Sequence, residues 1–193
     1  KNAEHDNGWD HVRFHHTAHC FAFGLRHRNA SSAVVVTHSM NNSVYECRIE
    51  GNRGHNGFIA GGHSTRNLFY NLKAGTAFHS FGISGYASGN VFYNCMMDEP
   101  GSIDCHGGLT IYNLFDNIYG GSWVHGGSRA NLPPAHARRL CIWNWKVGMT
   151  ESYKGRIKQT IGGHGEYPGF VFYGIRGLYG QTLFQREVDD GLI

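Results

Sequence analysis

Asn90-Val91-Phe92-Tyr93-Asn94 is one copy of a short apolar and aromatic motif that closes on a polar residue, and its recurrence decides the fold. The first residues of four such copies lie 24, 23 and 23 positions apart. A repeat of this length, with a short strand and a turn in each unit, is typical of a parallel β-helix with one repeat per turn. The other copies are Ser43-Val44-Tyr45-Glu46-Cys47, Asn67-Leu68-Phe69-Tyr70-Asn71 and Asn113-Leu114-Phe115-Asp116-Asn117.

Equivalent positions of successive repeats are expected to lie on top of one another. A single turn cannot bury its apolar face or pair its strand edges alone, so it depends on the turns above and below it. Asn71, Asn94 and Asn117 fall in one column, which predicts a ladder of side-chain amides hydrogen-bonded along the helix axis. Asn144 is expected to extend this column, and Cys47 to occupy it in the preceding turn.

The composition agrees with an all-β chain. Its 193 residues include 28 Gly, 12 Phe and 10 Tyr but only 4 Pro, and no long run carries a helical period. The length and the 40% hydrophobic content suit one domain with a real core. We therefore predict one right-handed, single-stranded parallel β-helix over residues 1–193, with regular turns at 10–147, final strands and loops at 148–176, and a C-terminal tail or closing helix at 177–193.

The ends of the chain suggest that the solenoid is incomplete. The first residues, Lys1-Asn2-Ala3-Glu4-His5-Asp6, are polar but show no helical cap. Because solenoids cover their terminal turns, we expect this chain to be the C-terminal part of a longer helix, completed by a missing N-terminal part or by a partner subunit. No apolar stretch approaches the length of about 18 residues that a membrane helix needs, so no membrane contact is expected.

Charge indicates the kind of partner. Lys and Arg number 17 against 14 Asp and Glu, and 14 His residues add positive charge in mild acid. Most of the basic residues are Arg, which suits capture of carboxylates. An anionic polymer is therefore the expected partner. Nucleic acid is not expected, because the basic residues are scattered and no recognised DNA or RNA module is present. The five Cys include no paired spacing that would predict a disulfide framework or a zinc ribbon.

Several short phrases carry a family resemblance. The chain resembles the pectate-lyase-like superfamily of right-handed parallel β-helices over residues 10–186, within an uncharacterised branch found among carbohydrate-active proteins. Superfamily members mostly cleave acidic polysaccharides, by β-elimination or by hydrolysis. The resemblance therefore implies a secreted, periplasmic or extracellular protein that acts on an acidic polysaccharide and requires no cofactor, with calcium the divalent metal to consider. The phrases are Gly54-His55-Asn56-Gly57, Gly89-Asn90-Val91-Phe92, Asp104-Cys105-His106-Gly107-Gly108, Asn113-Leu114-Phe115-Asp116 and Ile142-Trp143-Asn144.

A histidine column is predicted on the surface of the coil. When the turns are aligned on the repeated motif, His55 and His79 fall at nearly one position, Ser102 follows in the next turn, and His125 is a fourth member. Such a column can transfer protons near neutral pH. The alternative is that its side chains only stack on one another and have no catalytic role.

Asp104 and His106 are the strongest catalytic candidates. They stand two residues apart on an expected strand, so their side chains face the same way. Asp104 aligns with Phe81 of the preceding turn, so a polar group replaces an apolar one. If both face outward, they join His79 and Asp98 in a cluster suited to proton transfer.

The remaining site predictions concern substrate binding and metal. Arg53 and Arg66 flank the histidine turns and are candidates to clamp an acid group, while Trp123 and Trp143 are candidates to stack on sugar rings. No metal ligands are predicted, because the sequence has no His-Glu-x-x-His or comparable spacing.

Two enzymatic mechanisms stay open. In elimination, His106 or His79 removes the proton α to a uronate carboxylate while Arg53 or Arg66 neutralises that carboxylate. The basic balance of the chain favours this mechanism.

In hydrolysis, two carboxylates flank the glycosidic bond at about 5.5 Å or about 6.5–9.5 Å. The candidates for that pair are Asp98, Asp104 and Asp116. The alternative from a different class is a β-helix that only binds glycans or serves as a structural module.

Overall fold

The computed structural model describes residues 9–75, 77–98, 101–125, 139–146 and 171–173. Within these ranges the regular structure is entirely β-strand. The strands are β1 (Asp10–His15), β2 (Phe21–Phe23), β3 (Arg26–Arg28), β4 (Ser32–Thr37), β5 (Ser43–Tyr45), β6 (Arg48–Glu50), β7 (Asn56–Gly61), β8 (Leu68–Tyr70), β9 (Lys73–Ala74), β10 (His79–Ile83), β11 (Val91–Met97), β12 (Ser102–Cys105), β13 (Leu114–Tyr119), β14 (Ser122–His125), β15 (Cys141–Lys146) and β16 (Val171–Tyr173).

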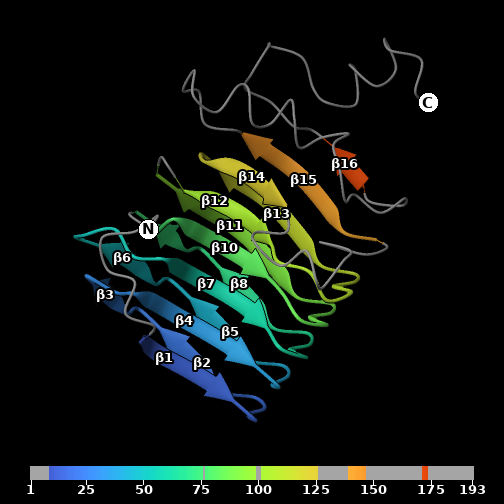
Figure 1. The fold of residues 1–193 in the computed structure, drawn as a ribbon, viewed down its shortest axis with the longest axis horizontal. Coiled ribbons are helices and arrows are strands. Elements are labelled where there is room, and N and C mark those ends of the chain that lie inside the picture. The colour runs from blue at the N-terminus through green and yellow to red at the C-terminus, as the bar shows by residue number, and fades with distance from the viewer. Residues whose placement is uncertain (1–8, 76, 99–100, 126–138, 147–170, 174–193) are drawn as a thin grey trace.

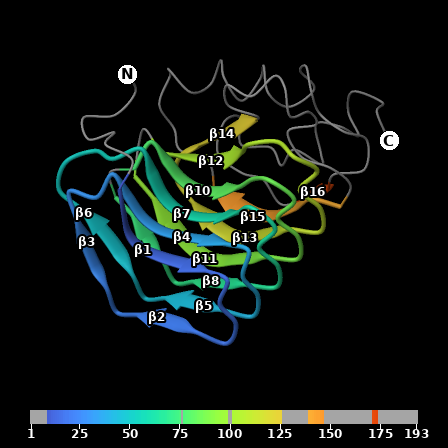
Figure 2. The same ribbon diagram turned by 60° about the horizontal axis from the view of Figure 1, so that its bottom comes forward.

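The predicted parallel β-helix is confirmed, with about five turns. A six-stranded sheet has the order β1-β4-β7-β10-β12-β14. A ten-stranded sheet runs from β16 through β15, β13, β11, β8 and β5 to β2, and its other three strands pair in the order β11-β9-β6-β3. Figures 1 and 2 show the chain crossing between the two sheets once per half turn. All the strand pairs among the described residues are parallel, and each pair joins two neighbouring turns.

The repeated motif forms the strands of the ten-stranded sheet, and its central aromatic residue points into the core. Phe69, Phe92 and Phe115 are fully buried and stacked, with ring centroids 4.3 and 4.7 Å apart. The two flanking residues of each motif face outward, because side chains alternate along a strand. The number of residues between copies of the motif is therefore the number that places each core aromatic ring directly on the ring of the previous turn.

The predicted amide ladder is confirmed in its central part. Asn94 donates from Nδ2 to Oδ1 of Asn71 over 3.3 Å, and Asn117 donates in the same way to Asn94 over 2.9 Å. Asn144 occupies the same position on β15, but its amide donates to Asp116 instead. All four Asn residues have φ between +50° and +55°, which Asn tolerates better than most residues.

The prediction for Cys47 is wrong. Ser43 pairs with Leu68 rather than with Asn67, so the first copy of the motif begins one residue earlier than expected. Glu46 therefore takes the position in the amide column, with φ of +53°, and Cys47 points into the core. A shift of one residue along a strand moves a side chain to the opposite face.

A second amide ladder lies inside the solenoid and was not predicted. It runs through Asn42, Asn67, Asn90 and Asn113, all of them buried. Oδ1 of Asn67, Asn90 and Asn113 each accepts from both the backbone N–H and the side-chain amide of the preceding Asn, at 2.9–3.1 Å. These paired bonds fix the register of one turn on the next.

The imidazole of His27 is buried in the core near the first turns of the solenoid. Its Nε2 has no hydrogen-bond partner among the described residues. It packs edge-on against Phe58 and lies 5.7 Å from the ring of His11, measured between centroids. Burial, aided by His11, lowers the pKa of His27 from 6.5 to about 4. In the folded protein His27 is therefore neutral at pH values well above 4.

His27 should make the fold sensitive to acid. Below pH 6.5 the unfolded chain takes up a proton at His27 while the folded chain does not, so stability falls by about 3 kcal/mol between pH 6.5 and 4. A His27→Leu variant should lose about 3 kcal/mol less over the same range in denaturant unfolding measured against pH. His19→Asn, an exposed control, should keep the wild-type slope, and equal slopes for all three proteins would contradict the assignment.

Two predictions fall outside this description. The final loops at 148–176 lie outside the described residues except for β16, and the closing helix at 177–193 lies outside them entirely. Within the described ranges there is no helix with the length and apolarity to cross a bilayer.

Candidate functional site

The candidate site lies on the outer face of the six-stranded sheet. Ile103 and Cys105 on β12 point into the core, so Asp104 between them points outward. Asp104 pairs with Gly82, which in turn pairs with Ile59. Gly82 has no side chain, and Cδ1 of Ile59 packs over it: an added Cβ would lie only 2.8 Å from that atom, so the site has no room for a side chain.

The register differs from the prediction by one residue. Asp104 was expected beside Phe81, but the pairing of β10 with β12 shifts between His79 and Phe81. His79 pairs with Ser102 on one side, as predicted, and with Asn56 rather than His55 on the other. The irregularity turns Asp104 from the core column to the outward column.

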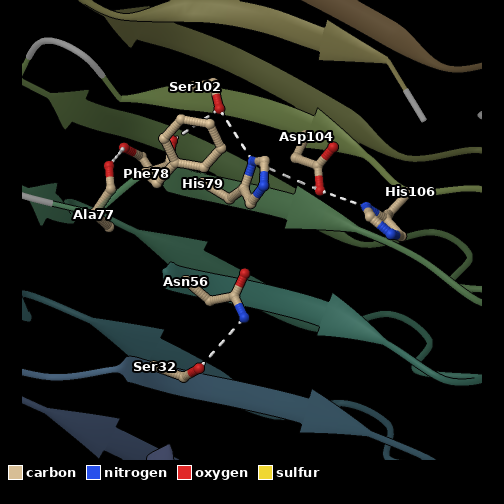
Figure 3. Close-up of polar contacts among 9 residues, drawn as sticks. Ser32, Asn56, Ala77, Phe78, His79, Ser102, Asp104 and His106 are labelled. Atoms are coloured by element: carbon tan, nitrogen blue, oxygen red, sulfur yellow. Dashed lines mark hydrogen bonds and ion pairs between the residues drawn. The ribbon is translucent and has the colours of Figure 1, made fainter. Parts of the chain in front are cut away.

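Three side chains form a cluster at this point, which we call the Asp–His cluster: His79, Asp104 and His106. Oδ2 of Asp104 lies 3.0 Å from Nδ1 of His106 and 3.8 Å from Nδ1 of His79. Figure 3 shows the carboxylate between the two imidazoles. The side chains of Asp104 and His79 are only 7% and 8% exposed, whereas that of His106 is 25% exposed. His106 is thus the member most open to solvent.

The hydrogen bonds fix which imidazole nitrogens carry protons. A carboxylate only accepts, so His106 donates from Nδ1 to Asp104 and has its lone pair on Nε2. Oγ of Ser102 donates to the carbonyl of Phe78 over 2.9 Å, so it accepts from Nδ1 of His79 over 3.3 Å. In its neutral form, each of the two imidazoles therefore has its lone pair on Nε2.

A buried oxygen points to a ligand. Oδ1 of Asp104 is buried and has no hydrogen-bond partner among the described residues. An unpaired buried carboxylate oxygen is costly, which is explained if a bound donor satisfies it. The cluster borders a pocket of ≈ 190 Å³. The pocket is lined by His55, Asn56, Ile59, His79, Gly82, Ile83, Ser84, Asp104 and His106.

The electrostatics keep His79 neutral. Burial is the largest influence and lowers the pKa of His79, and the positive neighbours His55, His106 and Arg53 lower it further. The charge of Asp104 acts in the opposite direction without reversing the shift. His79 is accordingly an uncharged base or hydrogen-bond partner at neutral pH.

Aromatic and cationic groups surround His79 at the edge of the Asp–His cluster. The rings of His55 and His79 lie 5.1 Å apart, although the two residues are not paired in the sheet. Phe78 packs edge-on against His79, and the guanidinium of Arg53 lies 4.7 Å from the centre of the Phe78 ring. Arg53 is thus placed beside the Asp–His cluster.

One family model, described as a domain of unknown function (DUF4955), matches residues 76–185, more than half of the chain. The chain belongs to the DUF4955 family. The matched span contains the whole Asp–His cluster, while His55 and Arg53 precede it. No curated protein and no solved structure matches the chain.

Several predicted residues of the DUF4955 chain lie away from this pocket. Asp98 borders a separate hollow of ≈ 220 Å³ with Arg48, Glu50 and Lys73. Arg66 is exposed on a turn that follows the six-stranded sheet. Neither residue is part of the Asp–His cluster.

The tryptophans do not join the pocket either. Trp143 is 39% exposed on β15, in the other sheet. Trp123 and His125 lie on β14, and their side chains are outside the described part of the chain. His125 pairs with Cys105, so the expectation that it continues the column of Ser102 is wrong.

The pocket of the DUF4955 chain does not fit calcium. Ca²⁺ takes six to eight oxygen ligands, whereas the pocket offers one carboxylate among three imidazoles. Among the residues that the structure describes, no group of three or more His, Cys, Asp or Glu is arranged to hold a metal ion.

Proposed function

We propose that this DUF4955 chain cleaves an acidic polysaccharide by β-elimination, in keeping with its resemblance to the pectate-lyase-like superfamily, and that it acts outside the cell or in the periplasm. The observation that carries the proposal is the Asp104–His106 pair, in which a buried carboxylate holds an accessible imidazole with Nε2 as the base. This is the arrangement that general base catalysis requires, and the nearby Arg53 suits an acidic substrate.

The proposed step needs only His106, Asp104, Arg53 and water. Nε2 of His106 takes the proton from the carbon α to the uronate carboxylate. The electron pair of that C–H bond becomes the new C=C bond, the β C–O glycosidic bond breaks, and the leaving oxygen takes a proton from water. Arg53 neutralises the carboxylate as negative charge develops on it. Asp104 is a positioning residue that stabilises the His106 imidazolium once it forms.

One further observation favours elimination over hydrolysis. A hydrolase of the usual kind needs two carboxylates across the scissile bond. Asp104 is the sole carboxylate among the residues that line the pocket, within the described part of the chain. Asp116 lies on the other sheet and accepts a hydrogen bond from Asn144, so it does not complete a pair with Asp104.

The test is incubation of the protein with acidic and neutral polysaccharides while two signals are followed. We expect ultraviolet absorbance from the unsaturated uronate to rise together with new reducing ends, and only with uronate-containing chains. Reducing ends without absorbance would mean hydrolysis and would contradict the proposal. Binding without either signal would favour the non-catalytic glycan-binding or structural alternative.

A further inference from the structure

A row of histidines follows the six-stranded sheet along the helix axis, outside the Asp–His cluster. We call it the histidine ladder: His15, His16, His38 and His63. His15 ends β1, and His16, His38 and His63 follow β1, β4 and β7 in three successive turns. All four are exposed. The ring centroids are 5.2 Å apart between His16 and His38, and 5.4 Å apart between His38 and His63.

The ladder leads toward the pocket. Tyr86 continues it in the next turn, stacked on His63 with centroids 4.8 Å apart, and is 48% exposed. Ser84, two residues before Tyr86, lines the pocket of the Asp–His cluster. The backbone of Tyr86 and Gly85 bonds to Gly108 and Gly107, directly after His106. Ladder and pocket thus form one continuous strip on the same side of the solenoid.

The charges around the ladder are positive. The pKa of His15 is lowered by partial loss of water and then by the positive neighbours His16, His38 and Arg13. No carboxylate is among the described groups that act on His15, and Asp10 is already paired with Arg13. Nδ1 of His15 bonds to the Thr37 hydroxyl, which carries no charge. Among the described residues, no carboxylate forms an ion pair with a member of the ladder, so its protonation adds positive charge along the row.

We propose that the histidine ladder is a binding track for a linear anionic polysaccharide, held along the helix axis when the imidazoles carry protons. A row of single charges at one per turn suits a chain with one acid group per sugar, and the exposed ring of Tyr86 suits stacking on a sugar face. The orientation of that chain toward the pocket rests on the proposed function, but binding to the ladder does not.

The backbone suggests a matched set of variants. His38, His63 and the exposed His19 all have φ between +50° and +59°. Asn is the side chain that best tolerates this conformation, so His→Asn removes the imidazole at little cost to the fold. The ladder variant is His38→Asn with His63→Asn. His19→Asn, which lies outside the ladder, is the control.

The experiment measures equilibrium binding of a long oligogalacturonide in the His106→Gln background, so that the probe stays intact. The measurement is made at about pH 5.5 and about pH 7.5, on either side of the ordinary imidazole pKa of about 6.5. We expect binding about tenfold tighter at the lower pH, weakened by salt, and equally strong in the His19→Asn control. The ladder variant should lose most of the pH-dependent gain, and neutral dextran should not bind.

Three results would contradict the proposed binding role of the histidine ladder. They are binding that does not depend on pH, a ladder variant that binds as tightly as the control, and binding of single-stranded DNA that depends on pH and on the ladder variant in the same way. Circular dichroism at about pH 7.5 checks folding, and the single His63→Asn variant replaces the double one if the latter does not fold. Since the assay records binding and not turnover, its failure is separate from the failure to detect cleavage in the polysaccharide panel.

Discussion

Replacement of His106 by glutamine should lower the rate of β-elimination by about 10²–10⁴-fold, because the amide cannot accept the α proton. The side chain is a quarter exposed and outside the core, so the fold should survive the change. The rate is measured from the absorbance of the unsaturated product under saturating substrate. A loss in kcat with little change in KM is expected, since the imidazole is needed in the transition state rather than for binding.

Two companion variants separate a catalytic role of His106 from a structural one. Asp104→Asn should also lower the rate and should change its pH profile, because an amide at this position can donate to Nδ1 and force the proton onto Nε2. His19→Asn should leave the rate unchanged. Full activity in His106→Gln would show that His106 is not the base. If that variant does not fold, the Asp104→Asn variant provides the test instead.

The fold could be predicted from the sequence because its cause is periodic. A core phenylalanine recurs once per turn in Phe69, Phe92 and Phe115, and the same spacing places an Asn at the turn that follows. The first turn was misread because Ser43 was aligned with Asn67, whereas Asn42 holds that position. The spacing of the motifs alone does not reveal a one-residue difference in turn length. The hydrogen bond between the buried amides of Asn42 and Asn67 does reveal it. Asn at the first position of each motif was the available signal.

The site could be predicted only in part. Asp104 and His106 were expected on one face because they are two residues apart, and His79 was expected beside them. The irregular pairing between β10 and β12 has no mark in the sequence, so the column of Asp104 was misassigned. Asp98 was expected to join the cluster from the turn that precedes β12. It lies instead where the chain leaves the ten-stranded sheet, beside a different hollow.

Residues that shape the pocket without chemistry of their own were missed. Gly82 lines the pocket and lets Ile59 pack over it, and Ser102 fixes the proton on Nδ1 of His79. Ser102 had been noted only as a member of the histidine column. The histidine ladder was missed for another reason: its members are spaced 22 and 25 residues apart in His16, His38 and His63, which is the turn length itself. A search for the solenoid period among polar residues would have found them.

The internal amide ladder should account for more stability than any surface feature of the solenoid. Oδ1 of Asn90 accepts from the backbone N–H and the Nδ2 of Asn67, at 3.1 and 2.9 Å. Its own Nδ2 donates to the carbonyl of Ser64 and to Oδ1 of Asn113, at 3.1 and 3.0 Å. Truncation to alanine removes all four hydrogen bonds, each worth about 1 kcal/mol, and leaves the backbone N–H of Asn67 buried without a partner. The other three groups each keep one bond: Nδ2 of Asn67, the carbonyl of Ser64 and Oδ1 of Asn113.

We therefore expect Asn90→Ala to lower the free energy of unfolding by about 4 kcal/mol, measured by denaturant titration. Asn94→Gly is the matched control, because it removes an amide from the outer ladder of the same strand while glycine suits its φ of +53°. Its amide is partly exposed, so water replaces the lost bonds and the cost should stay below about 1 kcal/mol. Equal losses in the two variants would mean that the stacked core rings, and not the buried amides, hold one turn in register on the next.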